Sequence, residues 1–304
     1  MASVAIVGPG RLGLALAAAF EEAGAVDQVV IFGRHREAPD HPVVRDSGVR
    51  YVHGLEPLPG DCQAVFLTVP DEAVPEVAYS LASQGEAPPG CAALHVSGIL
   101  PTDVLEPLHH RGYGAGSFYP LVVLTDPARG ASHFVGSWAA VTAAPETFRR
   151  IQLLADAIGV DVFAVPAFRR PLFHAAIALV QGAILPTLTH SSALLQQAGV
   201  DSDEALPALL SLARSTLDAL DEGGVSMAAA GPVAMGDIET TALHLRALDP
   251  ADQRTYAVLA RELLRLAGAE GEEGYASGAQ LRGAVEELLD RYAAPESTGV
   301  GAGQ

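Results

Sequence analysis

Hydrophobic residues are arranged differently in the two halves of the chain. In the first half, short apolar runs alternate with amphipathic segments of helical period, such as 11–24 and 148–159. Continuous apolar runs are typical of strands buried on both faces of a parallel sheet. The pattern therefore predicts an α/β domain with a doubly wound parallel sheet. Its strands are expected at 4–8, 29–33, 64–70, 92–98, 114–121, 138–143 and 160–166.

After Pro166 the strand-like runs end, and long segments rich in Ala and Leu follow. Good helix formers over such lengths predict an all-α C-terminal domain. We therefore expect one domain over 1–166 and a helical substrate and dimerisation domain over 167–293. The remaining residues, 294–304, are rich in Gly and Ser and are expected to form a disordered tail.

The longest apolar stretch covers residues 172–188 and includes His174, Gln181 and Pro186. Its length and polar content favour a buried core helix over a membrane span. The chain starts without a basic segment and runs directly into the first expected strand, so we expect no signal peptide. These features, with few cysteines, predict a cytoplasmic protein.

Charge and residue usage restrict the function further. The 304 residues carry a formal net charge of −18, which argues against a nucleic acid or an anionic membrane as partner. All 18 basic residues are Arg, so no Lys can act as general acid, Schiff-base former or phosphate ligand. Cys62 and Cys91 are expected as reduced, half-buried thiols. The histidines show no metal-ligand spacing, and no metal site is expected.

A glycine motif follows the first expected strand. Gly8, Gly10 and Gly13 have the G-x-G-x-x-G spacing and precede an amphipathic helix that starts near Arg11 and Leu12. In a strand–turn–helix context this spacing predicts a dinucleotide site, with the pyrophosphate at the helix N-terminus. The alternative interpretation is a Gly-rich turn with a structural role only.

The end of the second expected strand distinguishes NADP from NAD. NAD-binding proteins place an acidic residue there, but residues 29–36 contain none and include Arg34, His35 and Arg36. Since Arg binds phosphate bidentately, these residues predict NADP(H) as the cofactor. The alternative is a pair of solvated arginines on a loop.

Two further turns follow expected strands. Ligands of doubly wound sheets bind beyond the carboxyl ends of strands, so Val69, Pro70 and Asp71 are expected beside the nicotinamide ribose. Pro70 and Asp71 also fit a helix-initiating turn with Asp71 as N-cap, and both interpretations are compatible.

Six segments, in this order, resemble a poorly characterised Rossmann-like family that joins an NADP-binding domain to a helical domain of unknown function. They are "GPGRLG", "TVPDEAV", "LHVSGIL", "GSFYPL", "RRPLFHAAIALVQG" and "AAAGPVAMGDIETTALHLRAL". The family is similar in architecture to pyrroline-5-carboxylate reductase and to 3-hydroxyisobutyrate and 6-phosphogluconate dehydrogenases. The resemblance implies a homodimer, in which the helical domain completes the partner's cleft.

The chain departs from the family pattern at three places. Tyr119 stands where the family usually has His, Met235 stands where Arg is usual, and Gln181 and Gly182 stand where an Asn is common. The related hydroxyacid dehydrogenases use a Lys as general acid on the helix that follows Pro171, and this chain has no Lys. A Lys-dependent alcohol oxidation is therefore excluded.

Candidate catalytic groups are Tyr119, His174 and Ser97, with Asp237 as a residue that orients them. Packing is the alternative role for Tyr119, a turn cap for Ser97 and a helix cap for Asp237. His95 is a weaker candidate, because it lies within an apolar run and is better explained as a buried histidine.

These residues predict an NADPH-dependent oxidoreductase that reduces a small C=N or C=O substrate by hydride transfer, without a catalytic Lys. The alternative is an NADP(H)-binding protein with little or no catalysis, such as a sensor or scaffold.

Overall fold

The computed structural model describes residues 2–125, 131–269 and 276–293. The chain divides into two compact units, Met1–Gly182 and Ala183–Gln304. The domain boundary expected after residue 166 lies a few residues before the start of helix α6, Arg170–Gln197, which contributes to both units. The tail expected to be disordered, 294–304, lies outside the described residues.

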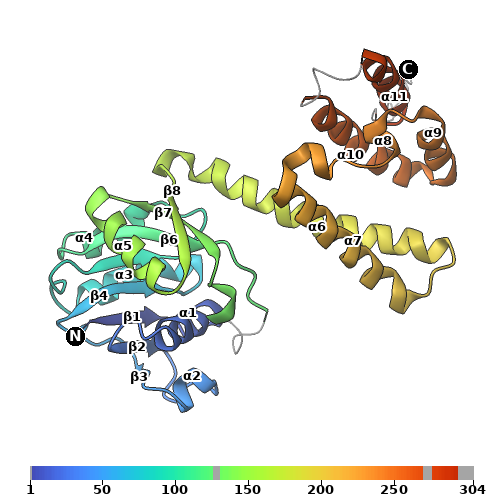
Figure 1. The fold of residues 1–304 in the computed structure, drawn as a ribbon. Helices are drawn as coiled ribbons and strands as arrows, with labels where there is room; N and C mark the ends of the chain where they lie inside the picture. Colours follow the sequence, from blue (N-terminus) through green and yellow to red (C-terminus); the bar gives the residue numbers. More distant parts are fainter. Residues whose placement is uncertain (1, 126–130, 270–275, 294–304) are drawn as a thin grey trace, which may run out of the picture. The chain divides into compact units, whose positions relative to one another are not determined.

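The first unit is built on one sheet, which has eight strands over the described residues, in the order β3-β2-β1-β4-β5-β6-β7-β8 (Figure 1). The strands are β1 Ser3–Val7, β2 Gln28–Gly33, β3 Arg50–His53, β4 Cys62–Leu67, β5 Ala92–His95, β6 Gly114–Pro120, β7 Ser137–Ala143 and β8 Val160–Ala164. The sheet is mostly parallel, as the apolar runs predict.

Two features of the sheet differ from the sequence prediction. β7 pairs with β6 in the antiparallel direction, between Gly116 and Ala143 at one end and Pro120 and Ala139 at the other. Antiparallel neighbours need no crossover helix, and the described part of the connection from β6 to β7 contains only a short 3-10 turn at 131–133. The apolar pattern does not predict β3, because an edge strand of four residues with Arg50 and His53 exposed produces no apolar run.

Helices cover both faces of the sheet. Along β1, Val4 and Ile6 pack into one apolar core with α1 (Arg11–Glu22) and α5 (Pro145–Ala157). Ala5 and Val7 pack into a second core with α3 (Val74–Ala82) and α4 (Glu106–His109). The side chains of a strand alternate between its faces, so β1, β2, β4 and β5 contribute to both cores. A short helix, α2 (Pro42–Arg45), follows β2.

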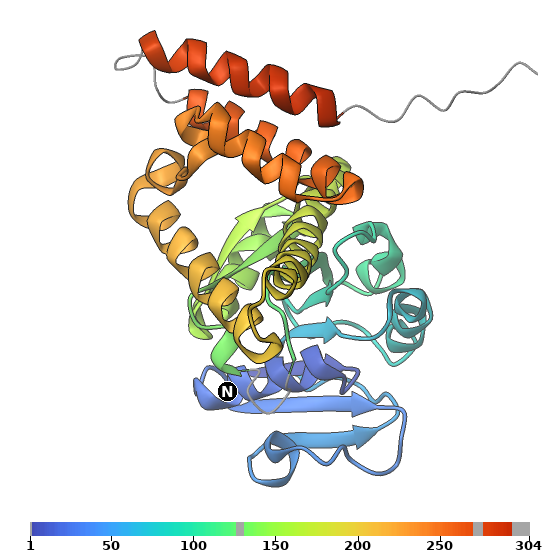
Figure 2. The same ribbon diagram turned by 90° about the vertical axis from the view of Figure 1, so that its right-hand side faces the viewer.

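The described residues of the second unit form helices joined by short loops, with no strand among them. It contains the C-terminal part of α6, then α7 Ser202–Ala228, α8 Pro232–Met235, α9 Ile238–Ala247, α10 Pro250–Ala269 and α11 Ala276–Ala293. Figure 2 shows α10 and α11 lying side by side. The core of the second unit contains Val233, Leu245, Ala257, Leu264, Val285 and Leu289. The expected all-α C-terminal region is therefore present.

The expectation of a buried core helix at 172–188 is wrong for the single chain. α6 leaves Leu172, Leu179, Val180, Ile184 and Leu185 exposed. The helix segment Ala167–Gln197 also has the length and composition of a membrane span, with a mean hydropathy of 1.6 in a window of which none is buried. An apolar composition predicts that a helix is covered, but it does not say whether the same chain covers it.

Candidate functional site

The glycine motif forms a tight turn between β1 and α1. Gly8 has a φ of +108°, and a Cβ atom there would lie 2.8 Å from the carbonyl oxygen of Thr68. A Cβ at Gly13 would lie 2.1 Å from the carbonyl oxygen of Gly8, so α1 packs directly against the turn. At Gly10 the nearest atom is the Thr68 oxygen, 3.9 Å away. Gly10 therefore leaves open space at the N-terminus of α1, where amide groups and the helix dipole favour an anion.

Thr68 ties this turn to the neighbouring strand. Its amide donates to Val7 O at 2.9 Å, and its hydroxyl is 2.7 Å from Gly8 O. Val69, the next residue, packs beside Gly8: a Cβ atom at Gly8 would lie 2.8 Å from Cγ1 of Val69. The turns after β1 and β4 are thus held together, as expected for a ligand site at the carboxyl ends of the strands.

The loop after β2 carries Arg34, His35 and Arg36, which are all exposed. Gly8 N donates to Phe32 O at 2.9 Å, so this loop lies next to the glycine turn. Tyr51 on β3 donates from its hydroxyl to His35 O at 2.7 Å and holds the loop. Among the described residues, neither Arg34 nor Arg36 forms an ion pair with an acidic side chain. The two guanidinium groups are therefore available to a phosphate.

Asp71 and Ser97 meet beyond β4 and β5. The Ser97 hydroxyl donates to Oδ2 of Asp71 at 2.6 Å and accepts from the amides of Ile99 and Leu100 at 3.2 and 3.1 Å. Asp71 begins a 3-10 turn whose N-cap is Pro70, and its carboxylate makes no cap bond there. The expectation that Asp71 serves as N-cap is therefore wrong, because Ser97 engages its carboxylate.

Tyr119 and His174 lie together at Gly98. The ring centroids of Tyr119 and His174 are 6.2 Å apart in an edge-to-face arrangement. A Cβ at Gly98 would lie 2.5 Å from Cδ2 of His174 and 3.0 Å from Cε2 of Tyr119. Burial, with a smaller effect of the Asp71 charge, raises the pKa of Tyr119. The structure thus brings three of the candidate catalytic residues, Ser97, Tyr119 and His174, to the loop after β5.

A cavity of about 350 Å³ connects Tyr119 to the glycine turn. Arg11 and Leu12 at the start of α1 line one side, and Val96 and Tyr119 line another. The Arg11 guanidinium is 3.3 Å from Leu124 O, which also borders the cavity. The cavity therefore joins the expected pyrophosphate position to one candidate proton donor, Tyr119, within one unit.

Arg170 and His95, beneath this site, are almost completely buried, with 1% and 0% of their surface exposed. The Arg170 guanidinium donates to Ser117 Oγ at 2.6 Å, to Thr142 Oγ1 at 3.0 Å and to the carbonyl oxygen of Ser97. Neither ring nitrogen of His95 has a hydrogen-bond partner among the described residues. Burial and then the Arg170 charge lower the pKa of His95 to about 4.

Sequence reasoning does not single out Arg170. A signal is present, since Arg170 lies four residues before His174 and therefore on the same face of a helix. The local sequence from Arg170 to His174 does not reveal that this helix face contacts β6, β7 and the turn after β5. His95 is expected to be a buried histidine, and it is buried.

The remaining candidate, Asp237, lies in the second unit. It is the N-cap of α9, and its carboxylate accepts from Thr240 N at 3.0 Å and Thr240 Oγ1 at 2.7 Å. These bonds lower its pKa, the Thr240 hydroxyl having the largest effect. The arrangement matches the capping role that is the alternative for Asp237. Of the departures from the family pattern, Met235 is 76% exposed, and no described atom lies near the Cβ position of Gly182.

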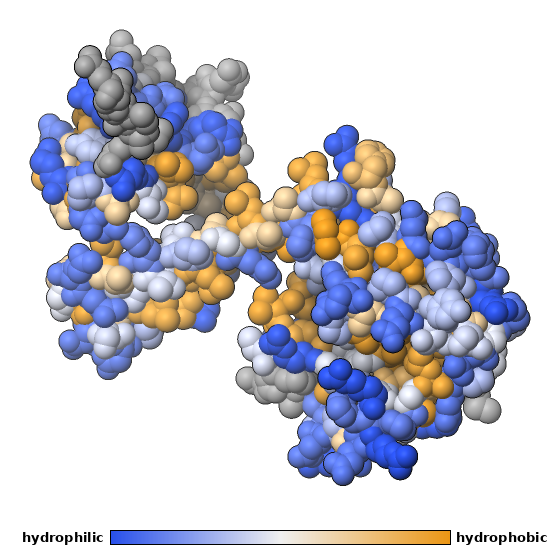
Figure 3. All heavy atoms as spheres, turned by 180° about the vertical axis from the view of Figure 1, so that it is seen from behind, coloured by the Kyte–Doolittle hydropathy of each residue, from blue (hydrophilic) through white to orange (hydrophobic). Residues whose placement is uncertain are grey.

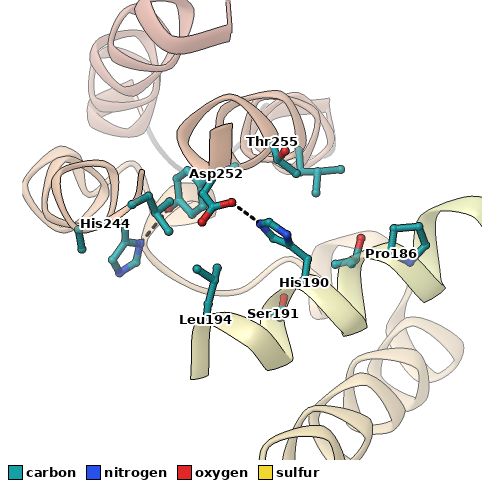
Figure 4. Close-up of a pocket in the computed structure, with 12 residues that line it drawn as sticks. Pro186, His190, Ser191, Leu194, His244, Asp252 and Thr255 are labelled. Carbon is teal, nitrogen blue, oxygen red and sulfur yellow. Dashed lines mark hydrogen bonds and ion pairs between the residues drawn. The ribbon is translucent and has the colours of Figure 1, made fainter. Parts of the chain in front are cut away.

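The second unit has its own cavity, of about 520 Å³, between α6, α9 and α10 (Figure 4). Nε2 of His190 is 2.9 Å from Oδ1 of Asp252 across this cavity, and Nδ1 of His244 is 2.9 Å from the Tyr256 hydroxyl. None of the sequence-predicted site residues lines it.

Comparisons with known proteins agree with this architecture. A family model described as a Rossmann-like domain matches residues 1–120, and one described as a domain of unknown function, DUF2520, matches residues 137–263. No curated protein matches the sequence.

Solved structures share the fold at low sequence identity. A protein from Bacteroides fragilis, described as a candidate NADP oxidoreductase, is 21% identical with a TM-score of 0.67, over 87% of this chain and 98% of that one. The pyrroline carboxylate reductase of Plasmodium falciparum, solved with NADP bound, is 9% identical with a TM-score of 0.60, over 93% and 98%. A reductive aminase from Aspergillus terreus, solved with NADPH and ethyl-5-oxohexanoate, is 16% identical with a TM-score of 0.55, over 96% and 94%.

The resemblance that the ordered motifs indicate is thus confirmed: residues 1–120 match a Rossmann-like domain, and residues 137–263, from β7 into α10, match the DUF2520 domain.

Proposed function

We propose that this protein is an NADPH-dependent oxidoreductase that reduces a small C=N or C=O substrate by hydride transfer. One observation carries the proposal. The cavity that begins at the N-terminus of α1 ends at Tyr119, and Tyr119 lies beside His174. A cofactor seated on the glycine turn would therefore extend toward groups that can handle a proton. The NADP(H) chemistry of the structural neighbours is consistent with this function.

The residues around the glycine turn fit the cofactor. The amides of Gly10, Arg11 and Leu12 would hold the pyrophosphate, because the open space at Gly10 allows its close approach. Arg34 and Arg36 would hold the 2′-phosphate, since no acidic residue lies between 29 and 36 to repel it. Val69, Pro70 and Asp71 would border the nicotinamide ribose.

When bound, the cofactor supplies the hydride; the protein must orient the substrate and deliver one proton. Tyr119 is the proposed donor to the carbonyl oxygen or imine nitrogen, because it lines the cavity and a tyrosine hydroxyl is protonated at neutral pH. His174, beside Tyr119, would accept a hydrogen bond from the substrate or return a proton to Tyr119. The Ser97 hydroxyl is already engaged by Asp71, so Ser97 orients Asp71 instead of donating to substrate.

Two measurements test the proposal. NADPH and NADH binding are compared by calorimetry, and NADPH consumption is followed with cyclic imines, 2-oxo acids and aldehydes. We expect NADPH to bind at least roughly tenfold more tightly than NADH and at least one substrate class to be reduced. Equal affinities contradict the NADP assignment. Tight NADPH binding without turnover on any compound indicates the alternative, a cofactor-binding sensor or scaffold.

A second copy of the chain is the proposed partner. The exposed leucines and other aliphatic residues of α6 form an apolar surface that a homodimer would bury, and apolar side chains are visible at the surface in Figure 3. This helix also contains polar residues among its apolar ones, which favours a protein partner over lipid; they include His174, Gln181 and His190. Sedimentation without detergent should give a dimer; a monomer, or a chain recovered only in detergent, contradicts the proposal.

A further inference from the structure

We propose that Arg170 is a positioning residue, which fixes His174 and the Ser97–Gly98 loop in one geometry. This inference rests on the proposed function, since it concerns the same site.

The Arg170 guanidinium reaches three neighbouring segments. It donates to Ser97 O in the turn after β5, to Ser117 Oγ on β6 and to Thr142 Oγ1 on β7. The Thr142 hydroxyl in turn donates to Val165 O at 2.7 Å, just beyond β8. A planar fork with fixed donor directions can hold several acceptors in one arrangement, which a single ammonium cannot do.

Arg170 belongs to the helix that carries His174. The two residues are one turn apart, at i and i+4, so holding Arg170 also fixes the helix turn from which His174 projects. The same guanidinium holds the carbonyl of Ser97, whose hydroxyl engages Asp71. Gly98, the next residue, fits against His174 and Tyr119 with no room for a Cβ. One side chain therefore connects the loop, the carboxylate and the candidate donors.

Arg170 is 1% exposed, its Nε has no partner among the described residues, and desolvation lowers its pKa against a smaller opposing effect of the Asp71 charge. A buried charge whose hydrogen bonds go to neutral groups is a poor source of stability, because an apolar side chain of similar size often serves as well. The arrangement is better explained by the geometry that it imposes on the site.

The experiment compares Arg170→Met and Arg170→Lys with Arg169→Met. Arg169 is the adjacent residue, exposed and stacked near Phe168, and is the matched control. We expect both Arg170 variants to bind NADPH within about twofold of the wild type, because no contact of Arg170 involves the glycine turn. We expect kcat to fall about 100-fold in Arg170→Met and less in Arg170→Lys, which keeps the charge but not the fork. Arg169→Met should match the wild type.

A readout without substrate distinguishes this inference from the proposed function. In NMR spectra of the NADPH complexes, the ring signals of His174 should shift in both Arg170 variants and stay in place in Arg169→Met. If the wild type binds NADPH but reduces nothing, the proposed function fails and the His174 signals still decide the role of Arg170. Unchanged His174 signals together with an unchanged kcat in the Arg170 variants overturn the inference.

If Arg170→Met does not fold, a milder variant still tests the inference. Ser117→Ala removes one acceptor of the guanidinium and leaves the charge in place. We expect it to fold, to bind NADPH normally and to lower kcat about three- to tenfold while shifting the His174 signals. A lower melting temperature with wild-type kcat and wild-type His174 signals would show that the network only stabilises the fold, and the inference would be rejected.

Discussion

The hydroxyl of Ser97 donates a 2.6 Å hydrogen bond to the carboxylate of Asp71, across 26 residues of sequence. A hydroxyl has a single donor hydrogen, and here Asp71 accepts it. The same oxygen accepts from two amides of its own turn. Ser97 is therefore a structural link between the turns after β4 and β5, and its value to the site lies in where it holds Asp71.

Replacement of Ser97 by Ala removes this link. Three hydrogen bonds are lost in a buried turn, so the free energy of unfolding should fall by about 2 kcal/mol. Urea denaturation measures the change. Ser83→Ala is the control, since its hydroxyl bonds only to Ser80 O at an exposed site, and we expect a change below about 0.5 kcal/mol. Equal stability of the two variants would contradict the role given to Ser97.

Gly10 and Gly13 should respond differently to Ala. In Gly13→Ala the new Cβ meets the Gly8 carbonyl at 2.1 Å, so unfolding should become about 3 kcal/mol easier. In Gly10→Ala the nearest atom is 3.9 Å away, so stability should hardly change, whereas NADPH affinity should fall at least roughly tenfold. Thermal melts and calorimetry check both results. A Gly10→Ala variant that binds NADPH normally would rule out close backbone approach at this residue.

Arg34 and Arg36 should determine the preference for NADPH. Loss of a charge-assisted phosphate contact in Arg34→Ala or Arg36→Ala should weaken NADPH binding about 10- to 100-fold and leave NADH binding nearly unchanged. Arg50→Ala is the control, because Arg50 is exposed and pairs with Glu56 at 3.1 Å. An equal loss of NADPH and NADH affinity would show that these arginines do not recognise the 2′-phosphate.

Tyr119→Phe should separate chemistry from binding. The change removes the proposed proton donor and keeps the ring that packs against His174 and Phe173, so kcat should fall about 100-fold or more with NADPH affinity unchanged. Burial raises the pKa of Tyr119 above 10, so wild-type kcat should not fall on the alkaline side below about pH 10. A loss of kcat through neutrality would assign the proton to an imidazolium.

His95 should make the fold sensitive to acid. Its pKa is about 4 in the folded chain and 6.5 when the ring is fully hydrated, so between these values the unfolded chain binds a proton that the folded chain does not. Stability is therefore lost as the pH falls from about 6.5 to 4, by about 3 kcal/mol. His95→Leu should lack this loss and should be at least as stable at pH 7, because two unpartnered buried nitrogens are removed. Parallel pH profiles of stability for the two proteins would contradict the assignment.

Local sequence is sufficient to predict the glycine turn between β1 and α1. Gly8 and Gly13 are required within a few residues of each other, because a single turn and the helix that follows it leave no room for a Cβ at either position. Most strands are also predictable, because burial on both faces makes them continuously apolar. The direction of β7 is not predictable in this way, since a strand of either direction has the same apolar residues.

What the sequence by itself determined is therefore the two-part architecture, the glycine turn and the absence of any Lys for catalysis. Only the tertiary structure placed Tyr119, His174 and Ser97 at one loop, because three segments from 97 to 174 meet there through strand order. It also showed that Arg170 is buried beneath them and that α6 is exposed. Both results depend on contacts between residues distant in sequence, and no local pattern of apolar and polar residues contains that information.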